Sequence, residues 1–193
     1  MSNKENIKKI GIFFLMLIGS IIFKTITKSL FFPTIQKEKT IEFTADEYFN
    51  NSLVFKKIFS IVKSEDILPS EKIKILDNEV ESLIREINSS KIPKKDKIML
   101  LNDNFPLEII NFCKIFCYMQ KGLQSLDLNA IYTAKDLGLK NKILPKSLKE
   151  ELLNLLNDSE NIIIKIKNNT LTKKELEFFI KNLENLQKNY TRL

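Results

Sequence analysis

The chain has 193 residues, of which 44% are hydrophobic and 28% charged, a balance typical of a folded protein rather than a disordered one. It has no histidine, which excludes nucleophilic catalysis by Ser–His or Cys–His systems. The net charge is +7, but only two of the basic residues are arginines, Arg85 and Arg192. Because arginine is the preferred reader of bases and phosphates, we expect no nucleic-acid partner.

The N-terminal region reads as a membrane segment. Residues 1–9 form a short basic tail, and residues 10–23, "IGIFFLMLIGSIIF", carry no charge. A membrane span needs about 20 apolar residues, although 17 can serve, and extension to Ile26 reaches that length. We therefore predict a transmembrane signal-anchor over residues 10–30 that contacts the lipid bilayer. A cleaved signal peptide is the alternative, but no A-x-A-like site follows.

The predicted orientation makes this a single-pass membrane protein with a cytoplasmic N-terminus. The domain would then be extracytoplasmic, on the periplasmic side if the source is bacterial. Lysines flank the apolar segment on both sides, so the positive-inside rule contributes little to this prediction. An extended linker is expected over residues 31–45, and a helical domain over residues 46–193.

The first half of that domain shows helical patterns in succession. A capping box, Thr44 with Glu47, predicts a helix over about residues 45–64. Pro69 starts a second helix that runs to about Asn88, because its apolar positions follow a 3-4-3-4 spacing. These positions are Ile73, Leu76, Val80, Leu83 and Ile87. A short helix is expected near residues 94–102, after the break at "SSKIPKKDK".

Both glycines of the predicted domain are expected to end helices. Phe105-Pro106 sets up a helix that Gly122 would end, and "LNAIYTAKDLG" predicts a shorter helix that ends at Gly138. Neither glycine belongs to a phosphate-binding loop motif, so no nucleotide cofactor is indicated.

The stretch "EIINFCKIFCYMQKG" holds both cysteines, Cys113 and Cys117, four residues apart. A structural zinc site needs about four ligands, usually cysteine or histidine, and this chain supplies two. Apolar side chains cover most of the predicted helix circumference, so we expect both thiols to pack in the core. A disulfide with another chain, a metal site and a helix lying in or on the bilayer stay open as alternatives, although Lys114 argues against a span.

The C-terminal third predicts an antiparallel helical hairpin. Ser147 with Glu150 forms a second capping box before a helix to about Lys167, and Thr172 with Glu175 forms a third. The last helix has a heptad stripe typical of a coiled coil. We expect the hairpin to pack on the domain, while part of the stripe could receive a partner. This candidate partner-binding stripe is Leu176, Phe179, Leu183, Leu186 and Tyr190.

Paired carboxylates are the remaining source of catalytic chemistry. The candidates are Asp46 with Glu47 and Glu150 with Glu151, all at helix starts, where the helix dipole explains acidic residues. We therefore expect no catalytic residue, no metal-binding or cofactor-binding residue, no cofactor and no small-molecule substrate.

Together these patterns predict an all-α protein: a transmembrane signal-anchor followed by a bundle of about six helices that ends in the hairpin. The function expected is that of a membrane-anchored helical interaction domain, a scaffold or assembly factor that binds another protein without catalysis. One alternative is a chaperone-like binder of unfolded polypeptide at the membrane. A carboxylate-based enzyme is a further alternative.

Overall fold

The computed structural model describes residues 52–144 and 146–191, without the side chains of residues 99, 103 and 184–191. This part of the chain contains no strand and folds into seven α-helices and one short 3₁₀ helix. The helices are α3 (Leu53–Lys63), α4 (Pro69–Ser89), α5 (Lys94–Leu101), η1 (Asn102–Asn104), α6 (Phe105–Ser125), α7 (Leu128–Lys140), α8 (Lys146–Lys167) and α9 (Lys173–Thr191). The predicted all-α helical bundle is confirmed. The predicted anchor over 10–30 and linker over 31–45 lie outside the described residues.

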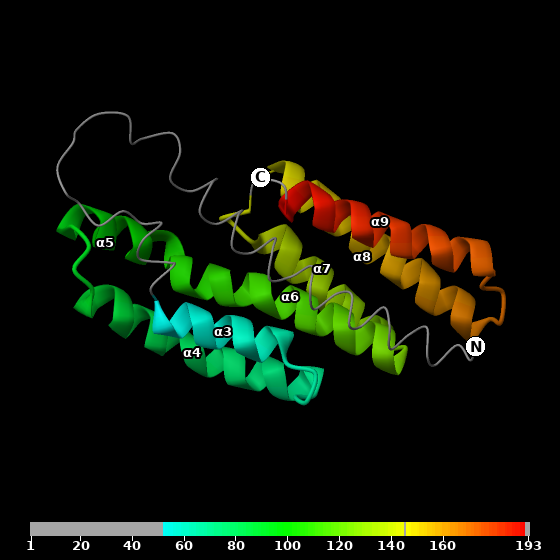
Figure 1. Cartoon of the computed structure of the whole chain (residues 1–193), viewed down its shortest axis with the longest axis horizontal. Helices are drawn as coiled ribbons and strands as arrows, with labels where there is room; N and C mark the ends of the chain where they lie inside the picture. Colours follow the sequence, from blue (N-terminus) through cyan, green and yellow to red (C-terminus); the bar gives the residue numbers. More distant parts are fainter. Residues whose placement is uncertain (1–51, 145, 192–193) are drawn as a thin grey trace.

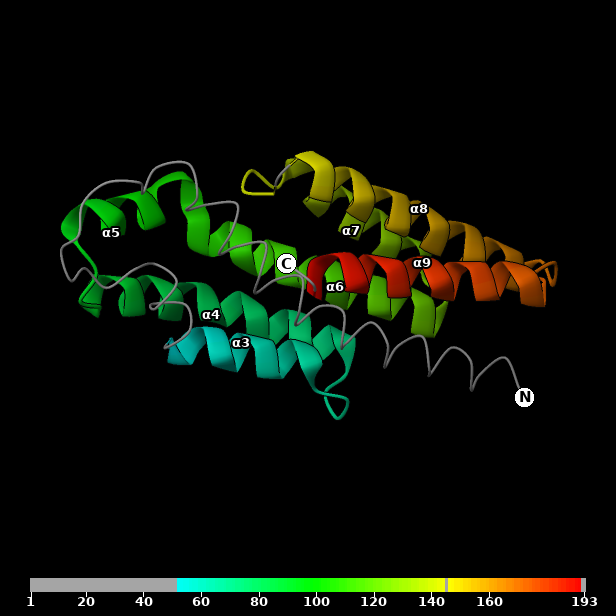
Figure 2. The same ribbon diagram turned by 45° about the horizontal axis from the view of Figure 1, so that its top comes forward.

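Helix α6 lies in the middle of the bundle, as Figure 1 and Figure 2 show from two directions. It packs against α4 on one side and against α7 and α8 on the other. Helix α3 covers α4, and α9 packs on α8. The bundle therefore has two parts on either side of α6, α3–α4 and α7–α8–α9.

The first predicted helix starts later than expected. Ser52 has a non-helical backbone, with φ −59° and ψ 123°, so no helix runs continuously over residues 45–64. Instead the Ser52 hydroxyl accepts a hydrogen bond of 3.0 Å from the Phe55 amide and caps α3 at Leu53. The predicted capping box of Thr44 and Glu47 lies outside the described residues. The next helix, predicted from Pro69 to about Asn88, is confirmed as α4.

Helix α4 holds both ends of α3 with side chains of opposite charge. The Glu86 carboxylate accepts hydrogen bonds from the Ser52 hydroxyl and from the Leu53 amide at 2.9 Å, at the N-terminus of α3. The Lys72 ammonium donates to the Val62 carbonyl oxygen at 2.9 Å, at the C-terminus. Because a helix has a partial positive charge at its start and a partial negative charge at its end, both contacts are favourable.

Helix α6 carries most of the core. Fourteen of its 21 residues are buried, which is why its sequence shows almost no polar face. The Phe112 and Phe116 rings meet edge to face with centroids 5.2 Å apart, a favourable aromatic geometry. Cys113 and Cys117 are buried and free, so the predicted core packing of both thiols is confirmed.

Neither Gly122 nor Gly138 ends a helix, contrary to prediction. Helix α6 continues past Gly122 to Ser125, and α7 continues past Gly138 to Lys140. A Cβ on Gly122 would lie only 2.6 Å from the Cδ1 of Ile131, so this glycine permits the close packing of α7 on α6. The helix end that Gly122 was expected to provide is formed instead by Leu126, which has a positive φ of 54°.

The second predicted capping box is also wrong in position. Helix α8 begins at Lys146, so Ser147 lies inside the helix rather than at its N-cap. The α8–α9 hairpin itself agrees with the prediction, since α8 ends at Lys167 and α9 follows after a short turn.

Candidate functional site

The α8–α9 hairpin contains a groove with a volume of about 320 Å³. Its floor is apolar, and charged side chains of both signs stand around it. The lining residues are Asp158, Asn161, Ile162, Lys165, Lys174, Glu175, Phe178 and Phe179. This combination of apolar floor and polar rim is the usual anatomy of a small binding surface.

Local capping motifs fix the ends of the two helices that form the groove. Helix α8 ends in a Schellman motif, in which the Thr170 amide donates to the Lys165 carbonyl at 2.9 Å and the Asn169 amide to the Ile166 carbonyl at 3.1 Å. Helix α9 begins with the predicted capping box, which is confirmed. The Thr172 amide donates to Glu175 Oε2 at 3.0 Å, and the Glu175 amide donates to the Thr172 hydroxyl at 3.3 Å.

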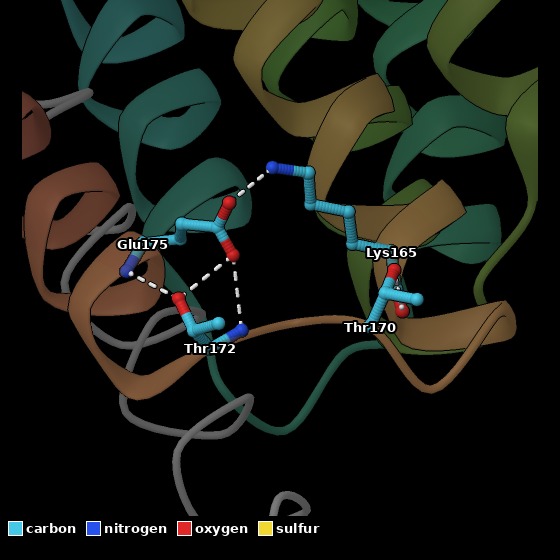
Figure 3. Close-up of polar contacts among 4 residues, drawn as sticks. All are labelled: Lys165, Thr170, Thr172 and Glu175. Carbon is cyan, nitrogen blue, oxygen red and sulfur yellow. Dashed lines mark hydrogen bonds and ion pairs between the residues drawn. The ribbon is translucent and has the colours of Figure 1, made fainter.

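An ion pair joins the two helices at the closed end of the hairpin. Figure 3 shows the Lys165 ammonium directed at the Glu175 carboxylate, which Thr172 also contacts. The hydrogen bond from Lys165, followed by those from the Thr172 amide and hydroxyl, lowers the pKa of Glu175 to about 2. A carboxylate with so low a pKa is a weak general base near neutral pH, so this pair is suited to holding the hairpin rather than to proton transfer.

Phe178 is the most exposed of the apolar side chains that line the groove, with 63% of its surface accessible. Its neighbour Phe179 is buried in the core. The two rings differ because successive residues of a helix point about 100° apart, so only one of them can face α8. Phe178 is therefore the residue that can bury the most new apolar surface when something binds at the groove.

The structure places the candidate partner-binding stripe mainly inside the domain. Phe179 and Leu183 are buried, and Leu176 packs half-buried against the core. The side chains of Leu186 and Tyr190 lie outside the described residues. The partner-binding role of the stripe stays a prediction, since of its described side chains only Phe179 lines the groove, and that side chain is 2% exposed.

Sequence reasoning missed Phe178, Lys174 and Asp158 as groove residues. The doublet Phe178-Phe179 was the available signal, because a heptad stripe accommodates one of two successive aromatic residues and leaves the other on its flank. The charged residues carried no comparable signal, since lysines and acidic residues are frequent throughout the chain.

The cysteine region contains a buried polar contact that the sequence did not reveal. Lys72 is fully buried, and its ammonium donates to Gln120 Oε1 at 3.2 Å as well as to the Val62 carbonyl. Burial lowers the pKa of Lys72, while nearby Cys117 and Glu65 act in the opposite direction. Burial also raises the pKa of Cys117, to about 12, and raises that of Cys113. Both thiols are therefore protonated near neutral pH and weakly nucleophilic.

Of the two candidate acidic pairs, only Glu150 with Glu151 lies among the described residues. Glu150 is exposed and lies 3.9 Å from the Lys146 ammonium, and Asp46 and Glu47 lie outside the described residues. Among the residues whose side chains the structure describes, no group of three or more cysteine or acidic side chains is placed to hold a metal ion.

In the described part of the chain, no helix combines the length and the apolar character needed to cross a membrane. Comparison with protein-family models, with curated proteins and with solved structures gave no match. The described part of the chain is an all-α helical bundle with a surface groove between two of its helices.

Proposed function

We propose that this chain is a membrane-anchored helical interaction domain that binds another protein and catalyses no reaction. The observation that supports this most is Phe178, whose ring is 63% exposed at the edge of a groove flanked by charges of both signs. Aromatic residues at the centre of such a surface, with polar residues around them, commonly supply most of the binding energy of an interface.

The chemistry of the groove supports binding over catalysis. Its two carboxylates, Asp158 and Glu175, come from different helices, and Glu175 is held by Lys165 and Thr172. An acid–base pair needs two carboxyl groups whose pKa values are tuned apart near neutral pH, whereas the pKa of Glu175 is about 2. We therefore assign the groove a docking role.

A photocrosslinking experiment tests the docking role in the full chain within its native membranes. A photoreactive phenylalanine analogue takes the place of Phe178 in one protein and of Leu139 in a matched control. Leu139 is comparably exposed, at 60%, but lies on α7 outside the groove. We expect a discrete protein adduct from position 178 and little from position 139. Equal adducts at both positions, or none at position 178, would contradict the proposal.

A chaperone-like binder of unfolded polypeptide is the second candidate. Exposed apolar side chains on several helices, such as Leu53, Ile98 and Tyr132, favour it, because a binder of many sequences uses dispersed apolar contacts. The same crosslinking experiment separates the two functions. A binder of unfolded chains gives many adducts of different mass and binds unfolded peptides with dissociation constants of about micromolar.

The anchor belongs to this proposal as well. The uncharged residues 10–23 support a bilayer contact through residues 10–30, with the helical domain on the extracytoplasmic side. An impermeant label directed at a C-terminal tag, applied to intact and to opened cells, tests both points. Labelling only after the cells are opened would overturn the extracytoplasmic location. Release of the chain from membranes by high salt would overturn the anchor.

A further inference from the structure

The groove residues form a pattern that is complementary to itself. Lys174 and Asp158 both line the groove, and neither forms an ion pair within the described part of the chain. Asp158 accepts a long hydrogen bond of 3.5 Å from the side-chain amide of Asn182. The groove thus presents a cation and an anion whose charges are not neutralised by a neighbour.

The register of the hairpin places Phe178 midway between these two charges. Two contacts fix that register, Lys165 with Glu175 and Asn182 with Asp158. The two helices are antiparallel, so toward the open end of the hairpin the residue number falls on α8 as fast as it rises on α9. Phe178, three residues after Glu175, therefore lies level with Ile162, three residues before Lys165. Lys174 is then four residues from Phe178 along α9, and Asp158 is four residues from Ile162 along α8. At a rise of about 1.5 Å per residue, each charge lies about 6 Å from the level of Phe178, in opposite directions.

We propose that the partner at this groove is a second copy of the chain, bound by two-fold symmetry about an axis beside Phe178. Rotation by a half turn about that axis exchanges the two ends of the groove. Lys174 of each copy then meets Asp158 of the other, and the two Phe178 rings meet at the centre. A two-fold interface needs a surface that matches itself in this way, because each contact occurs twice.

A second copy fits the groove better than an unrelated partner, because the chain itself already supplies every element required. The exposed Phe178 is both the protruding side chain and part of the groove that receives its counterpart. The product is a four-helix arrangement of two α8–α9 hairpins, a packing that helices form readily. The inference rests on the proposed binding role of the groove and names its occupant.

Charge exchange between two variants tests the symmetry directly. Lys174→Glu places two acidic residues opposite each other in the dimer, and Asp158→Lys places two basic residues opposite each other. Each variant alone therefore gains two repulsive contacts. A mixture of the two forms a mixed dimer in which the two substituted side chains face each other with opposite charges. The native Lys174 and the native Asp158 face each other at the second contact, so both pairs attract again.

The measurement is sedimentation velocity of the full chain in a mild non-ionic detergent, from about 1 μM to 1 mM, a range that covers weak assemblies. We expect dimers of the unmodified chain, and a dissociation constant raised about tenfold or more in each single variant. The equimolar mixture should regain dimers. Phe178→Ala should also weaken the dimer, whereas Leu139→Ala on α7 should leave it unchanged. Circular dichroism of each variant verifies that the helices are intact.

Restoration in the mixture is the decisive result, since chance occupation of one micelle by two chains does not depend on these charges. A monomeric unmodified chain at about 1 mM, or variants that dimerise as the unmodified chain does, would overturn the inference. If the chain is monomeric yet crosslinks another protein through position 178, the inference fails and the proposed function stands. If dimers form and position 178 crosslinks only to itself, the inference stands and the binding of another protein fails.

Discussion

Lys72 on α4 and Lys165 on α8 are two lysines in different surroundings, one in the core and the other at the surface. Lys72 is fully buried, and its ammonium contacts two neutral acceptors, the Val62 carbonyl and Gln120. Lys165 has a side chain that is 41% exposed and is paired with Glu175. The buried lysine joins α3, α4 and α6 but is closed to any ligand, whereas the exposed lysine borders a groove that a ligand can enter.

This difference indicates which part of the bundle is structural and which is free to bind. In the α3–α4–α6 part, the buried Lys72 ammonium binds the Val62 carbonyl and Gln120, so its removal leaves two buried acceptors without this donor. In the α8–α9 hairpin, the ion pair of Lys165 and Glu175 remains in contact with water, with side chains 41% and 38% exposed, so its removal changes the surface more than the fold. Matched substitutions in the two parts test whether this division holds.

The largest effect is expected from Lys72→Ala. This variant leaves the Val62 carbonyl and Gln120 without their donor and opens a cavity where the lysine stem was, so we expect a loss of about 3 kcal/mol in the free energy of unfolding. Lys165→Ala, the same substitution at the surface, should cause a far smaller loss. Chemical denaturation measured by circular dichroism compares the two. Equal losses would mean that Lys165 is as structural as Lys72.

The pH dependence of the free energy of unfolding provides a second test of the burial of Lys72. Burial lowers the pKa of folded Lys72 below the ordinary value of 10.5. Between these two values the unfolded chain binds more protons, so the free energy of unfolding gains a contribution as pH rises through this window. The gain is complete above 10.5 and is lost as pH falls through the folded value. Lys72→Met, which keeps the apolar stem, should remove it.

Cys113 and Cys117 change the free energy of unfolding with pH in the opposite direction, in the part of that pH range above 9.0. Their raised pKa values mean that the folded protein keeps protons that the unfolded chain releases above the ordinary thiol value of 9.0, so this contribution is lost as pH rises. The unmodified chain and Lys72→Met carry the same thiols, but the charge of Lys72 also lowers the pKa of Cys117, so the difference between the two profiles reports Lys72 together with its coupling to Cys117. Profiles that run parallel would contradict a lowered pKa for Lys72.

A smaller effect is expected where α7 packs on α6. A methyl group at Gly122 would lie 2.6 Å from Ile131, whereas one at Gly138 would find its nearest neighbour at 3.8 Å. We expect Gly122→Ala to lower the free energy of unfolding by about 1–2 kcal/mol. Gly138→Ala should raise it by up to about 1 kcal/mol, through helix propensity. Thermal unfolding of both variants checks this, and Ile131→Val should partly rescue Gly122→Ala.

The comparison also shows which features a sequence can reveal. The box of Thr172 and Glu175 was predictable because both partners lie within one turn, where residue spacing determines geometry. The buried contacts of Lys72 were not, because Gln120 is 48 positions away and the pairing depends on how α4 and α6 pack. Glu86, whose contacts with α3 span more than 30 positions, was missed for the same reason.

The errors at Gly122 and Ser147 have a related cause. Both residues match a helix-boundary motif locally, yet tertiary packing determines where the helices end. At Gly122 the close approach of Ile131 explains the glycine without any helix end. The apolar stripe of α4 and the described part of the stripe of α9 were predicted better, because burial of one helix face is a property of the whole segment.

The smallest predicted effect concerns the turn between α8 and α9. Asn169 has a positive φ of 55° at the C′ position of the Schellman motif, where glycine is most favourable. We expect Asn169→Gly to raise the free energy of unfolding by about 0.5 kcal/mol, and Asn169→Ala to lower it by a similar amount. Both are measurable by chemical denaturation. Because the turn shares no contact with Lys72, the effects of Asn169→Gly and Lys72→Met should add in the double variant. A clear departure from additivity would show that the hairpin and the α3–α4–α6 part are coupled, and the division between a structural part and a binding part would then fail.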